Sequence, residues 1–311
     1  MSRFPLRIGV DEIATETQKC DGFTFFCLPE RYAPDFSKDV ASLLAKGHLP
    51  GFHGKKFKVA HTAAYTEFLT LAYEYIRKSP QAFAACRLFS EKVKTELLSF
   101  GKRLVARALK QSAVGENAVA FDTVSPYFLP LASLAALSRE LAPRAVMRVE
   151  LDECTLYKGL DGVVDHQAGV PIPAGTLLKG LYNGYAKGLH SRTPLLPEDG
   201  VRVLKDSKSA LVQAADVIGN FALAYFFVAL GSRSKSRVAK ANVLRSVFGD
   251  EMPVVEPGDK IALLGNDLIL KDNGSVTFKI CWVPVAGTGN PELMKNWPKD
   301  DGLLGKGQVQ P

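Results

Sequence analysis

Two periodicities of apolar residues alternate along the chain, and together they favour an α/β protein. Alternation with a period of two predicts strands, and apolar residues spaced three and four apart predict helices. Strands are predicted at 4–14, 23–30, 81–89, 144–156 and 201–206, and helices at 36–47, 61–79, 91–111, 123–141, 206–227 and 232–249.

Two further segments have a different pattern. Residues 159–200 are rich in glycine and proline and are predicted to leave the core and loop over one face. Tyr182 and Tyr185 within this segment, and Tyr157 just before it, either stack on bases or pin the loop. Residues 259–285 alternate around an Asp-Asn-Gly turn, which predicts a hairpin. The predicted organisation is one α/β domain over 1–250, with 159–200 inserted, and a hairpin with its tail over 251–311.

Composition places the chain among globular proteins, with 47% hydrophobic and 23% charged residues. The balance of 39 Lys plus Arg against 32 Asp plus Glu gives a net charge of +7, which favours a polyanionic partner such as nucleic acid. Five cysteines without a CxxC pair favour reduced thiols and a cytoplasmic protein.

Several classes of protein are disfavoured. The longest apolar run, 217–231, is interrupted by Asn220 and is shorter than the roughly 20 residues that span a bilayer, so a buried helix without a membrane partner is expected. No P-loop or GxGxxG motif follows a predicted strand, and no Ser-His-Asp combination can be assembled.

Carboxylates end or interrupt three apolar elements, which is the main chemical signal of the sequence. Asp11 and Glu12 follow one predicted strand, Asp152 and Glu153 follow another, and Asp216 lies inside a long apolar helix. An ionised carboxylate at the edge of a core is costly unless a cation, a metal or good donors meet it. The three sites therefore invite a shared explanation.

Convergence of these carboxylates would suit Mg²⁺ or Mn²⁺. If the two strands are neighbours, one acid of each pair can face the helix that carries Asp216. Asp152 is preferred over Glu153 as the ligand, although Glu153 continues the alternation of the apolar residues in its strand. Hard cations take oxygen ligands, and a pair of ions can hydrolyse a phosphodiester. A salt bridge from Asp216 to a buried Arg or Lys is an equally open alternative.

Asp206 and Asp216 are predicted to differ in role, although both lie on the same apolar segment. Asp206, with Ser207 or Ser209, is expected to cap the helix. Asp216 lies too deep in the helix to cap it, so its partner must come from elsewhere. Gln213 shares its helical face and is expected to steady a ligand or phosphate.

These motifs resemble family 3800 of the bacterial domains of unknown function, which is RNase H-like. The resemblance spans roughly residues 5–230 and rests on the acidic pair Asp11 and Glu12, on the His53-Gly54 step, and on the block "DSKSALVQAADVIG". It departs from the family where "DEIATE" replaces the usual "DESG", so that Ile13 stands in place of a serine.

The resemblance implies an RNase H-like mixed sheet flanked by helices, here with a C-terminal hairpin extension. It implies a metal-dependent nuclease, associated with phage defence or mobile elements. Asp11, Asp152 and Asp216 would bind the metal, with Glu12, Glu153 and His53 as supports. Expected substrate contacts come from Gln213, Lys208, Arg233, Lys235 and Arg237. The rival hypothesis, favoured by "DEIATE", is a non-catalytic module that binds nucleic acid or protein; a homodimer is left open.

Overall fold

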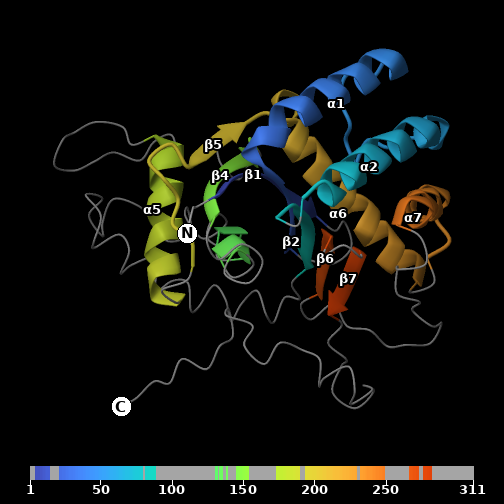
Figure 1. The fold of residues 1–311 in the computed structure, drawn as a ribbon. Coiled ribbons are helices and arrows are strands. Elements are labelled where there is room, and N and C mark those ends of the chain that lie inside the picture. Colours follow the sequence, from blue (N-terminus) through green and yellow to red (C-terminus); the bar gives the residue numbers. More distant parts are fainter. Residues whose placement is uncertain are drawn as a thin grey trace, which may run out of the picture.

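The computed structural model of this chain describes most of its predicted elements (Figure 1). The described residues are 4–14, 21–79, 81–88, 130–131, 133–135, 138, 145–153, 173–189, 193–229, 232–248, 266–272 and 276–281. The helix predicted at 91–111 and the turn predicted at 273–274 lie outside them.

A mixed sheet forms the centre of the described structure. Its strands follow the order β5-β4-β1-β2-β3, and β6 and β7 continue beyond β3. β4 is parallel to both β1 and β5, whereas β2 is antiparallel to β1 and β3. The strand bounds are β1 Phe4–Ala14, β2 Asp21–Pro29, β3 Phe83–Leu88, β4 Ala145–Asp152, β5 Val201–Leu204, β6 Asn266–Asp272 and β7 Val276–Cys281.

Helices cover the sheet on both sides. In Figure 1, α1, α2, α6 and α7 lie on one side of the strands and α5 lies on the other. Short 3-10 turns precede three of these helices. The bounds are η1 Glu30–Tyr32, α1 Ala33–Gly47, η2 Val59–His61, α2 Thr62–Arg77, α5 Ala174–Leu189, η4 Asp206–Lys208, α6 Ala210–Ala229 and α7 Lys235–Phe248.

α6 lies against the sheet at two glycines. A Cβ atom on Gly9 of β1 would come within 2.2 Å of the Leu211 carbonyl carbon, and one on Gly219 of α6 would come within 2.1 Å of Thr24 Oγ1. Backbones can approach this closely only where a side chain is missing. The two contacts place α6 on the face of β1 that carries Gly9 and Asp11.

Aromatic rings hold the segment 51–54 between α2 and α6. Phe52 stacks on Phe68 with ring centroids 4.2 Å apart, and Tyr65 stacks on Phe221 with centroids 5.6 Å apart. All four side chains are buried, so this loop is part of the core rather than a surface connection.

The predicted excursion over 159–200 is wrong for residues 174–189, which form α5. Its glycines hid a helical spacing of buried residues that includes Leu178, Leu181 and Tyr182. Tyr182 is fully buried and donates its hydroxyl hydrogen to the Pro194 carbonyl at 3.0 Å, so it offers no face to a base. Tyr157 and the side chain of Tyr185 lie outside the described part of the chain.

None of the described helices combines the length and the hydropathy needed to cross a bilayer. α6 has the most apolar sequence among them, but Gln213, Asp216 and Asn220 interrupt it on one face.

Candidate functional site

Asp11 and Asp216 form a pair of buried carboxylates between β1 and α6. Asp11 lies near the end of β1 and is 9% exposed, and Asp216 lies in the second turn of α6 and is 8% exposed. The charge of Asp216 raises the pKa of Asp11, so the two carboxyl groups lie close to each other. Two neighbouring buried carboxylates repel each other when both are ionised, so a proton or a cation between them would stabilise the pair.

The environment raises the pKa of both carboxyl groups. For Asp11, burial is the largest cause, and the charges of Asp216 and Asp152 add to it. For Asp216, burial again raises the pKa, while the Gly54 N–H and the charge of His53 oppose the rise. The effect of desolvation on the two pKa values is therefore larger than the opposing effect of the nearby donors and cations. A proton or a bound cation would stabilise the pair.

The alternation of side chains along β4 places Asp152 on the same face of the sheet as Asp11. The register sets Gly9 beside Glu150 and Val10 beside Leu151, so Asp152 continues the face of β4 that matches Asp11 on β1. Asp152 is half-buried and close enough for its charge to raise the pKa of Asp11. Glu12 lies on the opposite face of β1 from Asp11, and Glu153 directly follows the last residue of β4, so their supporting role stays a prediction.

α6 holds the 51–54 loop through hydrogen bonds that Asp216 and Gln213 accept. Asp216 Oδ2 accepts from the Gly54 N–H at 3.0 Å, and Gln213 Oε1 accepts from the Phe52 N–H at 2.9 Å. Tyr65 donates its hydroxyl hydrogen to the His53 carbonyl at 2.9 Å. Gln213 thus supports the loop, and its predicted contact with a ligand stays a prediction.

Asn220 is a site residue that the sequence analysis missed. Its Nδ2 donates to Asp216 Oδ1 at 2.6 Å and to the Asp216 carbonyl at 3.1 Å. A Cβ atom on Gly54 would lie 2.4 Å from the Asn220 Cβ, which explains the glycine in the His53-Gly54 step. The available signal was its position four residues after Asp216 on the same helical face.

His53 lies beside Asp216 without a direct hydrogen bond to it. Its Nδ1 is 3.9 Å from Asp216 Oδ2, beyond hydrogen-bonding distance. The charge of His53 still opposes the rise in the pKa of Asp216, so the predicted neighbourhood of His53 and the acids is present.

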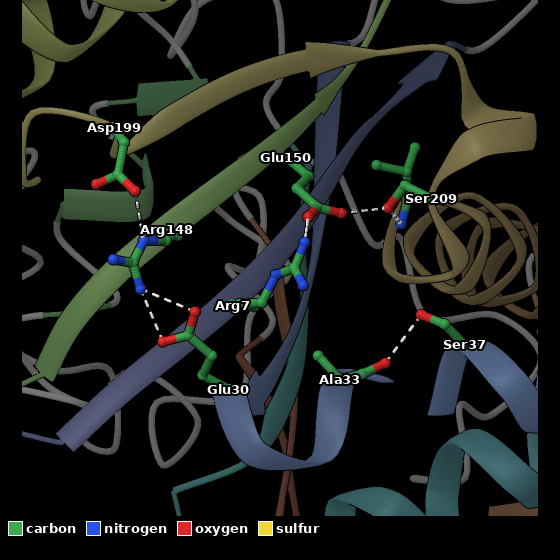
Figure 2. A network of polar contacts seen from close by, with 9 residues as sticks. Arg7, Glu30, Ala33, Ser37, Arg148, Glu150, Asp199 and Ser209 are labelled. Atoms are coloured by element: carbon green, nitrogen blue, oxygen red, sulfur yellow. Dashed lines mark hydrogen bonds and ion pairs between the residues drawn. The ribbon is translucent and has the colours of Figure 1, made fainter. Parts of the chain in front are cut away.

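A second acidic group, Glu150, ties the three elements of the site together (Figure 2). Its carboxylate forms an ion pair with Arg7 of β1 and accepts a hydrogen bond from Ser209 Oγ at 2.6 Å. Ser209 Oγ in turn accepts from the Val212 N–H at 3.1 Å, which makes Ser209 the cap of α6. Asp206 lies in η4, and its side chain is not described.

A separate, more exposed ion-pair cluster lies nearer the N-terminal ends of β4 and β5. Arg148 donates to Glu30 at 2.7 Å and to Asp199 at 3.0 Å (Figure 2). These groups are more exposed than Glu150, so their pairing is worth less to stability.

The predicted basic contacts lie on other elements. Lys208 is exposed on η4, Arg233 is exposed before α7, and Lys235 is its exposed first residue. Arg237 stacks over the Phe227 ring at 4.4 Å and donates to Ser232 Oγ at 3.3 Å. Lys55, which the sequence analysis did not single out, carries a charge that lowers the pKa of both Asp11 and Asp216.

The donor chemistry of the carboxylates fits a hard divalent cation. Within the described residues, no group of three or more His, Cys, Asp and Glu side chains is assembled closely enough to form a metal site. Asp11 and Asp216 nevertheless place adjacent carboxylate oxygens on two elements, with Asp152 on the same face of the sheet. Oxygen ligands of this kind are those that Mg²⁺ and Mn²⁺ prefer.

Comparisons with known proteins identify no family. No protein-family model matches the chain, and no curated protein matches it in sequence. Among solved structures, the chain is similar to the crystal structure of ribonuclease H2 from Pyrococcus horikoshii OT3, with 12% identity, 82% of each chain covered and a TM-score of 0.34. A likeness this distant carries no argument about the site.

Proposed function

We propose that this chain is an RNase H-like nuclease that hydrolyses phosphodiesters with Mg²⁺ or Mn²⁺. The observation that carries the proposal is the pair of neighbouring buried carboxylates, Asp11 and Asp216, which a bound cation would stabilise. Nucleic acid is the substrate class that a protein of net charge +7 favours.

The order of the strands supports the RNase H-like part of the proposal. Among β1 to β5, β2 alone runs against the others, and β1 and β4 are parallel neighbours. This is the arrangement expected of RNase H-like domains, which bring acids from two neighbouring strands and a helix together. We also propose membership of family 3800, on the motifs around Asp11, His53 and Asp216, which would imply a role in phage defence or in mobile elements.

Asp11, Asp216 and Asp152 would hold the ion. When bound, the ion would lower the pKa of a water molecule and neutralise charge on a phosphate. The chain's own residues orient the ligands: Asn220 Nδ2 and the Gly54 N–H hold the two oxygens of Asp216. For Asp11, the Glu12 backbone opposes the rise in pKa. His53 lies within reach of the same site and is a candidate for proton transfer.

Calorimetric titration of Mn²⁺ tests the proposal most directly. Wild-type protein is expected to bind Mn²⁺ and to cleave single- or double-stranded nucleic acid. Asp216→Asn is expected to lose both properties, because it removes a charged ligand while keeping the shape of the side chain. The matched control is Asp35→Asn on α1, an exposed aspartate that should leave binding and cleavage unchanged. Wild-type protein that binds no Mn²⁺ and cleaves nothing would refute the nuclease.

A non-catalytic RNase H-like module that binds nucleic acid or protein is the second candidate. Two observations favour it. Lys55 supplies a positive charge near both acids, and the Gly54 N–H and Asn220 Nδ2 already donate hydrogen bonds to the carboxylate of Asp216. Under this hypothesis a shared proton would satisfy the pair. Asp11→Asn would then leave partner binding unchanged, whereas it would abolish the activity of a nuclease.

A further inference from the structure

Four lysines lie on, or pack against, the segment that follows the 51–54 loop, and we call them the lysine rim. Its members are Lys55, Lys56 and Lys58, which follow the 51–54 loop, and Lys240 of α7. The first three are exposed. Lys240 Nζ lies 6.0 Å from the ring of Phe57, so α7 adds its charge to the same surface.

The rim is attached to the same backbone that holds Asp216. The Gly54 N–H donates to Asp216, and Lys55 is the next residue in the chain. Phe57 is buried between Lys56 and Lys58 and packs edge-on against Tyr65, with ring centroids 5.1 Å apart. The rim therefore begins at the residue after the Gly54 N–H donor to Asp216. Its segment is held in place by that hydrogen bond and by the packing of Phe57 against Tyr65.

We propose that the lysine rim binds the sugar–phosphate backbone of a nucleic acid and positions one phosphodiester at Asp11 and Asp216. This inference rests on the proposed function and names the part of the surface that holds the substrate. Three carboxylates would repel a polyanion, so an adjacent row of cations is needed to bring it near. Lys55, whose charge acts on both acids, is the member nearest to the reacting phosphate.

The side chains around the rim favour backbone contacts over base recognition. In the described part of the chain, the exposed large hydrophobic residues are Val59 and Leu195, and neither is aromatic. Base stacking needs an exposed ring, whereas ammonium groups bind phosphates of any sequence. We therefore expect strong salt dependence and weak sequence preference.

Fluorescence anisotropy with labelled oligonucleotides in EDTA tests the rim independently of any metal. The probes are a single-stranded DNA, a single-stranded RNA and a duplex of the same sequence, each titrated at several NaCl concentrations. The triple variant Lys55→Ala, Lys56→Ala, Lys58→Ala is expected to bind at least about 10-fold more weakly, with the slope of log affinity against log salt reduced by about 2 to 3.

The matched control removes the same charge from other elements. Lys38→Ala, Lys78→Ala and Lys187→Ala alter exposed lysines on α1, after α2 and on α5, and together should leave the salt slope within about one unit of wild type. Circular dichroism and a thermal melt establish that both triple variants fold. The single reversal Lys56→Glu, at an exposed position, repeats the test with one substitution.

The possible outcomes distinguish the proposal about the lysine rim from the proposal that the protein is a nuclease. Wild-type affinity and slope in the rim variant would overturn the rim, even if the protein binds Mn²⁺ and cleaves nucleic acid. Loss of binding in the rim variant, in a protein that takes up no Mn²⁺, would keep the rim and refute the nuclease. Equal losses of oligonucleotide binding in the two triple variants would also overturn the rim.

Discussion

The titration of Asp11 is the residue-scale property with the widest consequence. Burial raises its pKa, and the charges of Asp216 and Asp152 raise it further. The folded protein therefore holds a proton at a pH where the unfolded chain has released it. In that range the free energy of unfolding falls as the pH rises, because the folded state binds more protons than the unfolded state.

Replacement of Asp11 by asparagine should reverse this effect. Without divalent ions, Asp11→Asn is expected to be more stable than wild type at about pH 8, because it removes a buried negative charge. The difference should shrink toward about pH 4, where the ordinary aspartate also becomes protonated. Urea denaturation in EDTA at several pH values measures it. A variant less stable than wild type at about pH 8 would show that the carboxylate is well compensated.

Mn²⁺ supplies the control for that experiment. If the cation binds Asp11 and Asp216, it should raise the unfolding free energy of wild type at about pH 8 and leave Asp11→Asn unchanged. Equal stabilisation of the two proteins would mean that the ion binds elsewhere.

At the scale of elements, the contact of α6 with the sheet depends on Gly219. A methyl group there would meet the buried Thr24 Oγ1 and the Ile13 side chain. Gly219→Ala is expected to lower the free energy of unfolding by about 2 kcal/mol, because overpacking outweighs the gain in helix propensity. Chemical denaturation is the measurement, and Thr24→Ala in the same background should recover part of the loss.

Gly180 of α5 is the matched control for this substitution. It is an exposed helical glycine, and no atom lies within 4 Å of the place that an added methyl group would take. Gly180→Ala should therefore raise the unfolding free energy by about 0.5 to 1 kcal/mol. A stabilised Gly219→Ala would show that α6 can move away from β2 at little cost.

Glu150 links the elements that carry the three aspartates. It joins β4 to Arg7 of β1 and, through Ser209, to the start of α6. Glu150→Ala is expected to cost about 3 kcal/mol of stability, because it leaves a charge and a capping hydroxyl without their buried partner. It should also weaken Mn²⁺ binding although no proposed ligand has changed, which calorimetry would detect.

Two variants distinguish positioning from general destabilisation. The side chain in Glu150→Gln can still accept a hydrogen bond from Ser209 Oγ. This variant should therefore retain more Mn²⁺ affinity than Glu150→Ala under conditions where both variants are fully folded. Glu30→Ala breaks the exposed ion pair with Arg148 and should cost less than about 1 kcal/mol. Mn²⁺ affinity that is the same in wild type and Glu150→Ala would remove Glu150 from any positioning role.

For the molecule as a whole, the sequence predicted most of the elements and only part of the site. The strands at 4–14 and 201–206 and the helices carrying Asp216 and Lys235 agree closely with β1, β5, α6 and α7. α5 was missed because four glycines mask its buried face. Lys55 and Asn220 were missed because their relevance depends on which loop lies against α6.

The sequence by itself determined where acids meet apolar elements, because burial periodicity is a local property of the chain. Only the tertiary structure decided which acids meet. The pairing of Arg7 with Glu150 joins residues 143 positions apart, and the parallel register of β1 and β4 selects Asp152 rather than Glu153. A one-residue change of register would exchange the two faces without altering any local pattern, so periodicity alone cannot specify the site.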